Sequence, residues 1–192
     1  MDFQLPELLE ANGDTDTVFL LGNNCNNNTM FEDDDSEKIT PENLPIYKKG
    51  KEIYKVVKEI ADLIPEENEI LQDIRMQMLS DAAMLTVKVA GAEGGDLYDI
   101  RMQNAALIRK AANDLMIQNH SLKAFGFEYV EYFNIVRNLI EEYRLLFIDW
   151  VEGFDKWNYI IDRWGLFNPP GVGPHDKDPD DDIPFNPDQF FE

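Results

Sequence analysis

Histidines and carboxylates at helical spacing are the first candidates for chemistry in this chain. A carboxylate-bridged metal site inside a helical bundle needs glutamates and Glu-x-x-His pairs that point inward from facing helices. The sequence has two histidines, His120 and His175, and neither follows a glutamate at that spacing. We therefore interpret Glu93, Glu141 and Glu142 as charges on helix surfaces or at helix ends.

The sequence contains no recognisable nucleophilic or phosphate-binding motif. The single cysteine, Cys25, lies in an asparagine-rich stretch far from either histidine, and neither a nucleophile elbow nor a Cys/His cluster occurs. The segment Gly91–Gly95 shares only its composition with a phosphate-binding loop and is typical of a linker between helices. We therefore expect no catalytic residue, no metal ligand and no cofactor, and we expect that the protein is not an enzyme.

Four lysines at spacings of three, four and three residues predict a basic stripe along one helix: Lys48, Lys51, Lys55 and Lys58. A solvated helix face, with Glu52 and Glu59 alongside, explains this pattern without any partner. The functional alternatives are a docking site for an acidic partner, for the acidic ends of this chain, or for nucleic acid.

Four arginines raise a similar question: Arg101, Arg109, Arg137 and Arg144. Glu141 lies four residues after Arg137, so ion pairs within and between helices explain these charges more simply than a binding site does.

The second set of candidate partner-binding residues lies near the carboxyl end of the sequence: Ile183, Phe185, Phe190 and Phe191. The acidic run before Phe185 resembles the acidic tip with which bacterial single-stranded-DNA-binding proteins recruit partners. The alternative is an acidic tail that packs its phenylalanines on its own or a neighbouring bundle. In that case we expect its acidic residues to lie near the basic stripe, because opposite charges attract.

Apolar residues recur every three or four residues in four stretches, and this spacing predicts four helices. The first runs from Pro45 to Ile64, with Gly50 at one step of its apolar seam. The second helix is expected to start at Pro65, and the third is expected to start near Asp96, with Asn104 at one step of its apolar seam. The apolar seam of the last helix consists of Phe133, Val136, Ile140, Tyr143, Phe147, Val151 and Phe154.

Short connections between four such helices favour an up-and-down bundle, so the fold class that we predict is all-α. The predicted organisation is an acidic irregular arm over residues 1–42, the bundle over 43–164, and an acidic extended tail over 165–192. We expect the aromatic segment that contains Trp157, Tyr159, Trp164 and Phe167 to fold back over one end of the bundle.

The charge of the chain excludes some classes of partner. The net charge is -21, whereas affinity for nucleic acid comes largely from lysine and arginine. Residues 1–42 carry 11 acidic residues against one lysine, and residues 165–192 carry seven against one. A lone cysteine, an acidic start and the absence of a long apolar run indicate a cytoplasmic protein with no membrane partner.

The stretch from Ile46 to Leu79 carries a family resemblance. A first helix rich in Tyr and Lys, a Pro-Glu turn at Pro65, and the run Leu71-Gln72-Asp73-Ile74-Arg75 are its motifs. Over residues 46–152 the chain resembles the four-helix-bundle proteins of ribosomal-RNA intervening sequences and the retroelement accessory proteins. The resemblance implies a ring-like homo-oligomer without catalysis, and a surface that binds nucleic acid or a reverse transcriptase.

The functional hypothesis is therefore a non-catalytic helical-bundle adaptor, which forms a homo-oligomer and binds a protein partner. One alternative is an accessory protein for nucleic acid or a reverse transcriptase, which needs the Lys48–Lys58 stripe to be exposed. Another is an acidic decoy that inhibits a DNA-binding protein, which needs negative charge on a rigid face.

Overall fold

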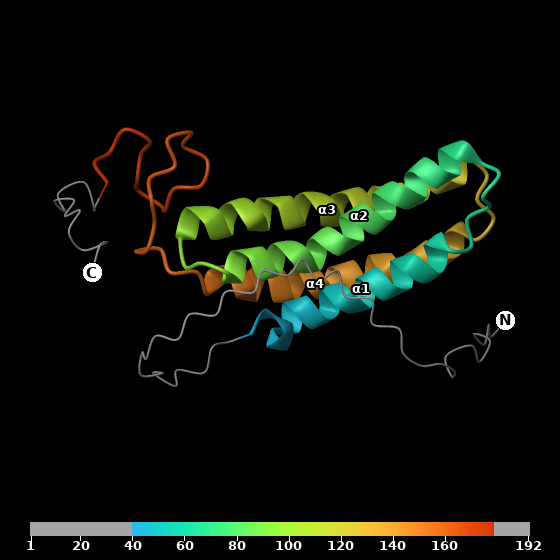
Figure 1. Cartoon of the computed structure of the whole chain (residues 1–192), viewed down its shortest axis with the longest axis horizontal. Coiled ribbons are helices and arrows are strands. Elements are labelled where there is room, and N and C mark those ends of the chain that lie inside the picture. Colours follow the sequence, from blue (N-terminus) through green and yellow to red (C-terminus); the bar gives the residue numbers. More distant parts are fainter. Residues whose placement is uncertain (1–39, 179–192) are drawn as a thin grey trace, which may run out of the picture. The chain divides into compact units, whose positions relative to one another are not determined.

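Residues 40–178 are described by a computed structural model, and within this range the chain forms four α-helices and no β-strand (Figure 1). The helices are α1 (Pro45–Ala61), α2 (Glu69–Glu93), α3 (Tyr98–Ala124) and α4 (Phe133–Glu152). Single 3-10 turns precede α1 and α4, at Pro41–Asn43 and Val130–Tyr132. The prediction of an all-α four-helix bundle is confirmed.

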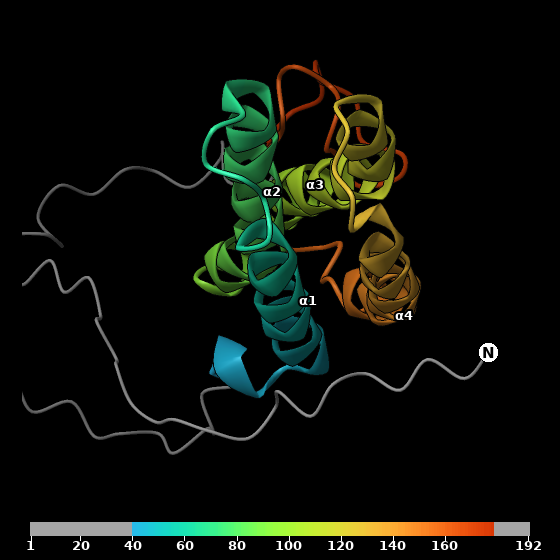
Figure 2. The same ribbon diagram turned by 90° about the vertical axis from the view of Figure 1, so that its right-hand side faces the viewer.

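Successive helices run in opposite directions along the bundle. Helix α1 packs against α2 and α4, α2 packs against α3, and the contact between α3 and α4 is the smallest of the four. Figure 2 shows this arrangement from one end, with α2 and α3 above α1 and α4. The α2–α3 connection and the segment after α4 therefore lie together at one end of the bundle (Figure 1).

Buried apolar residues from all four helices form one core, as the three-and-four spacing predicts. Its fully buried members include Ile53, Val57, Met78, Leu85, Val89, Ile108, Leu115, Phe133, Val136 and Tyr143. The phenol of Tyr143 on α4 donates a hydrogen bond of 2.8 Å to the carbonyl oxygen of Leu85 on α2. Burial raises the pKa of Tyr143 well above its ordinary value, so this phenol remains a donor.

The start of α2 differs from the sequence prediction. We expected the second helix to begin at Pro65, but α2 begins at Glu69. The reason is a side-chain cap: Asn68 Oδ1 accepts the backbone N–H of Leu71 at 3.1 Å and satisfies one of the free donors of the first turn. Pro65 therefore lies in the connection and not in the helix.

The apolar register of α3 also differs from the prediction. Asn104 was expected at a seam position, but it is only half buried and its amide donates to the carbonyl oxygen of Ile100 at 3.0 Å. Ile100 itself is exposed, whereas Tyr98 and Ala105 are buried. The helix ends before Gly126, whose φ of 81° interrupts the helix.

Hydrogen bonds cross the boundary that we expected at residues 164/165. The backbone N–H of Leu166 donates to Asp162, Arg163 Nη1 donates to the carbonyl oxygen of Pro174, and the N–H of Ile161 donates to Asp178. Residues 153–178 therefore form one hydrogen-bonded segment after α4, which we call the coda. Residues 1–39 and 179–192 lie outside the described range.

Across residues 40–178, no helix combines the length and the apolar character that a membrane span requires.

Gly50 permits the close approach of α1 to α2 that its place in the seam suggested. A Cβ atom at this position would lie 2.8 Å from Thr86 Cγ2 and 3.0 Å from the backbone oxygen of Leu85. A backbone oxygen in the middle of a helix cannot move aside without disturbing the α2 hydrogen bonds. The glycine is thus required by packing and not by its φ angle.

Gly50→Ala is expected to lower the free energy of unfolding by about 1 to 3 kcal/mol, because the added methyl group overpacks the α1–α2 contact. Gly91→Ala is the matched control, since the nearest atom to its Cβ is Asn104 Oδ1 at 3.7 Å. Alanine is preferred in a helix, so this change leaves stability equal or raises it by up to about 1 kcal/mol. Urea unfolding measures both, and equal effects would contradict the close contact at Gly50.

Candidate interaction surfaces

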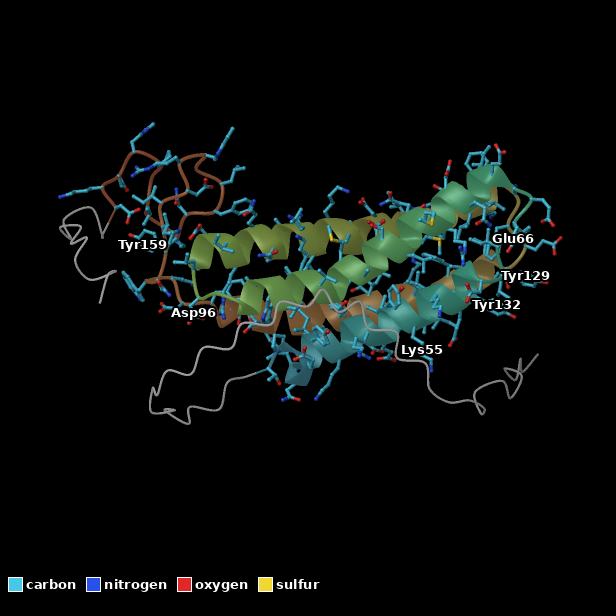
Figure 3. All side chains as sticks on the ribbon, viewed as in Figure 1. Lys55, Glu66, Asp96, Tyr129, Tyr132 and Tyr159 are labelled. Carbon is cyan, nitrogen blue, oxygen red and sulfur yellow. The ribbon has the colours of Figure 1, made fainter. Side chains whose placement is uncertain are left out.

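The four lysines of the predicted basic stripe are all exposed on α1. Lys48, Lys51, Lys55 and Lys58 form no ion pair with any residue between 40 and 178, and Figure 3 shows Lys55 pointing away from the bundle. Lys49 behaves differently, because hydrogen bonds to Glu142 and then Glu52 raise its pKa and tie α1 to α4. The stripe is thus available to a partner.

The second set of predicted binding residues cannot be placed. Ile183, Phe185, Phe190 and Phe191 lie outside the described residues, and so does Cys25. Their role in binding stays a prediction.

Glu93 and Arg101 form the most enclosed ion pair of the described region. Each side chain is 14% exposed, and Arg101 Nη2 lies 3.3 Å from Glu93 Oε2. The other carboxylate oxygen of Glu93 accepts the indole N–H of Trp150 at 2.8 Å. The guanidinium lies 5.3 Å from the ring centre of Phe154, which Trp150 contacts edge-on at 4.8 Å.

The remaining arginines differ in whether they form an ion pair. Arg144 pairs with Glu141 at 2.8 Å within α4, and the ion-pair interpretation is confirmed for it and for Arg101. Arg109 and Arg137 have no ion pair among the residues that the structure describes. The carboxylate that we expected beside Arg137, Glu141, is used by Arg144 instead.

The coda packs on the start of α3, as we expected of the aromatic segment. Phe154 is buried against Tyr98 and Ala105, and Tyr159 packs beside them. The backbone N–H of Tyr98 donates to the carbonyl oxygen of Asn158 at 2.8 Å, and the N–H of Ile160 donates to Asp99 Oδ1 at 3.2 Å. Figure 3 shows Tyr159 at this end of the bundle, as it shows Asp96 of the α2–α3 connection.

Asp162 organises the middle of the coda into a fixed turn. Its carboxylate accepts three backbone N–H groups, from Trp164, Leu166 and Phe167, at 2.8 to 2.9 Å. Asn168 bonds both backbone groups of Asp162, at 2.7 and 2.9 Å. Desolvation acts to raise the pKa of Asp162, but the three N–H donors outweigh it and hold the pKa below its ordinary value.

This turn displays apolar side chains to solvent. Trp164 is 91% exposed, Leu166 is 75% exposed, and Trp157 earlier in the coda is 89% exposed. We call these three residues the tryptophan turn. The aromatic segment packs on one end of the bundle through Phe154 and Tyr159, whereas Trp157 and Trp164 of the same segment remain exposed.

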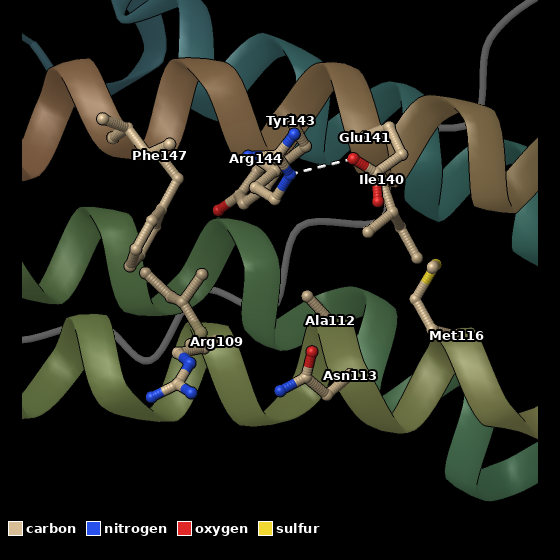
Figure 4. A pocket seen from close by; sticks show the side chains of 11 residues that line it. Arg109, Ala112, Asn113, Met116, Ile140, Glu141, Tyr143, Arg144 and Phe147 are labelled. Carbon is tan, nitrogen blue, oxygen red and sulfur yellow. Dashed lines mark hydrogen bonds and ion pairs between the residues drawn. The ribbon is translucent and has the colours of Figure 1, made fainter.

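A groove of about 310 Å³ lies between α3 and α4, where the contact between helices is smallest. Its apolar lining comes mainly from Ile108 and Met116 on α3 and from Ile140 and Phe147 on α4. Figure 4 shows Ile140 and Met116 pointing toward one another across it, with Arg109 and Arg144 near the opening. The apolar spacing of the two helices does not reveal this groove, because spacing does not show how closely neighbouring helices pack.

The described residues offer no metal centre. No group of three or more metal-ligating side chains occurs between residues 40 and 178, and both His120 and His175 are exposed.

Asp81 is the one charged or polar residue of that range that is buried. Its Oδ1 accepts the amide of Gln77 at 3.0 Å, while Oδ2 has no hydrogen-bond partner in the described part of the chain. Burial first, and then the neighbouring Asp114, raises the pKa of Asp81.

Comparison with known proteins gives no relative: no family model, curated protein or solved structure matches this chain.

Asp162→Asn is expected to loosen the tryptophan turn and leave the bundle folded. An amide keeps the oxygen that accepts Trp164 but replaces the oxygen that accepts Leu166 and Phe167 with a donor. Hydrogen exchange at residues 164–167 should accelerate while exchange in α1–α4 stays unchanged. Asp155→Asn is the control, because Asp155 accepts one N–H, from Trp157.

The same turn is expected to respond to acid. A carboxylate with a lowered folded-state pKa stabilises above its unfolded-state pKa and loses this contribution as the pH falls through the folded value. For Asp162 that loss lies below the ordinary value of 3.8. Exchange at residues 164–167 that accelerates already between pH 7 and pH 5 would contradict the role of Asp162.

Proposed function

We propose that this protein is a non-catalytic helical-bundle adaptor that forms a homo-oligomer and binds a protein partner. The observation that carries the proposal is the tryptophan turn, in which Trp157 and Trp164 are about nine-tenths exposed. Tryptophan is the residue type most enriched among interface residues that dominate binding energy. Two exposed tryptophans on the same segment contribute no hydrophobic stabilisation unless another surface covers them.

The rigidity of the turn supports an interface. Asp162 and Asn168 fix the backbone around Trp164 through five hydrogen bonds. A side chain presented on a fixed backbone loses less conformational entropy when it binds than one on a flexible loop. The same hydrogen bonds fix the backbone in a conformation that leaves the Trp164 side chain in solvent. The exposure of Trp164 is therefore a consequence of the structure of the turn.

A second copy of the chain is the partner that we propose for the tryptophan turn. Two copies related by a twofold axis would bring the same apolar residues together, which is the commonest form of oligomer contact. The resemblance over residues 46–152 to a family of ring-forming bundle proteins favours the same conclusion. In this proposal the basic stripe on α1 remains free for a different, acidic protein.

An accessory protein for nucleic acid or a reverse transcriptase is the second candidate. The specific observation in its favour is the exposure of Lys48, Lys51, Lys55 and Lys58 without ion pairs to any described residue. Lysine neutralises the charge of a phosphate backbone, and these four exposed cations share one helix face.

Trp157→Ser with Trp164→Ser is expected to reduce the native particle to a monomer of 22.2 kDa, as measured by light scattering coupled to gel filtration. Val87→Ser with Ile117→Ser removes two other exposed apolar side chains, each 60% exposed, and serves as the control that keeps the particle mass. Because like charges repel, self-association of this acidic chain should strengthen between 20 and about 150 mM salt. A wild-type monomer at 0.1 mM would overturn the homo-oligomer.

Lys51→Glu with Lys55→Glu tests the second candidate. If the stripe binds nucleic acid, single-stranded RNA should bind the wild type with an affinity that falls steeply with salt, and the variant should lose this binding. Wild-type protein that fails to bind RNA at 20 mM salt would exclude the nucleic-acid form of this candidate.

A further inference from the structure

The groove between α3 and α4 combines apolar lining with an unpaired cation. Ile108, Met116, Ile140 and Phe147 form its floor and sides. Arg109 stands at the opening, exposed and without an ion pair among residues 40–178, whereas Arg144 is paired with Glu141 (Figure 4). The opening therefore carries one net positive charge on a chain whose net charge is -21.

We propose that this groove binds residues 179–192 of the same chain. This segment contains Ile183, Phe185, Phe190 and Phe191, five acidic residues, and neither lysine nor arginine. Phenylalanine fits an apolar groove, and acidic neighbours meet the guanidinium groups at the opening by charge-assisted hydrogen bonds. The contact is independent of self-association through the tryptophan turn.

The end of the coda brings the segment to the right place. Asp178 accepts the N–H of Ile161, while the N–H of the preceding Ile160 donates to Asp99 in the first turn of α3. At about 1.5 Å per residue, Ile108 lies roughly 14 Å and Met116 roughly 26 Å along α3 from Asp99. Phe185, seven residues after Asp178, can extend about 23 Å, which covers the distance to Ile108, and Phe190, twelve residues after Asp178, can extend about 40 Å, which covers the distance to Met116.

The apolar surface is continuous between the coda and the groove. Phe147 packs with Tyr98, Ala105 and Phe154 under the coda and also lines the groove. Phe147 therefore connects the apolar cluster under the coda with the lining of the groove. The basic stripe on α1 has Tyr54, 38% exposed, as its large exposed apolar neighbour, because Ile53 and Val57 of that helix are buried in the core.

Chymotrypsin cleaves after phenylalanine, and its cuts after Phe185, Phe190 and Phe191 in the full chain measure the contact. We expect slow cleavage in the wild type and cleavage at least about tenfold faster after Arg109→Glu with Arg144→Glu, or after Ala112→Trp, which fills the groove. Lys51→Glu with Lys55→Glu has the same charge change on α1 and should leave the rate unchanged. Circular dichroism verifies that each variant remains helical.

A second measurement uses the groove itself. Replacing Phe185, Phe190 and Phe191 with serine should open the groove to the anionic dye ANS and raise its fluorescence, and Arg109→Glu with Arg144→Glu should remove the gain. Immediate cleavage of the wild-type segment, or faster cleavage in the α1 variant alone, would overturn the proposal. Protection that disappears on dilution would assign the contact to a second copy and overturn binding within the chain.

Discussion

The ion pair between Glu93 and Arg101 is the interaction on which the end of the bundle that carries the coda depends. Glu93 lies in the last turn of α2, Arg101 lies in the first turns of α3, and the same carboxylate holds Trp150 of α4. Arg101 also lies over the ring of Phe154, the first buried residue of the coda. One enclosed pair thus joins three helices and the coda.

Each charge of an enclosed ion pair has been removed from water. The pair is therefore stable only when further hydrogen bonds satisfy the remaining donors and acceptors of both side chains. Arg101 meets this condition with the carbonyl oxygens of Ala92 and Gly95 and with the carboxylate of Asp96. These groups all belong to the end of α2 and the α2–α3 connection. The position of that connection, and with it the surface on which the coda packs, is therefore fixed by charge as well as by apolar burial.

The helices could be predicted from the sequence because their signal is local, whereas the surfaces depend on contacts between distant residues. The seams of α1 and α4 follow from spacing alone, and Gly50 was recognised as a point of close approach. The α3 register failed where Asn104 bonded its own helix at Ile100. Nothing in the spacing distinguishes a seam that meets a neighbour from one that borders a groove, so the α3–α4 groove was missed.

The coda shows a second limit of sequence reasoning. Acidic residues in an irregular segment usually repel one another and stay solvated, and the sequence therefore predicts an extended tail over residues 165–192, of which the structure describes 165–178. A segment without helix or strand must still satisfy its backbone donors. Asp162, Asp176 and Asp178 do so by accepting backbone N–H groups. These aspartates therefore have a structural role, because their carboxylates accept backbone N–H groups that carbonyl oxygens would accept in a helix.

Two carboxylates with opposite pKa shifts give the bundle and the tryptophan turn opposite responses to pH. Burial raises the pKa of Asp81, so its contribution to stability is complete below the ordinary value of 3.8 and is lost as the pH rises through the folded-state pKa. Asp162 has a lowered pKa, so its contribution is complete above 3.8 and is lost as the pH falls. Acid protonates Asp81 and so removes the cost of burying its charge at the α2–α3 interface. Over the same pH range Asp162 is still ionised and still organises the tryptophan turn. The turn loses the negative charge of Asp162 only at a pH below the range in which Asp81 becomes protonated. The segment that carries Trp164 therefore loosens separately from the helices that support it.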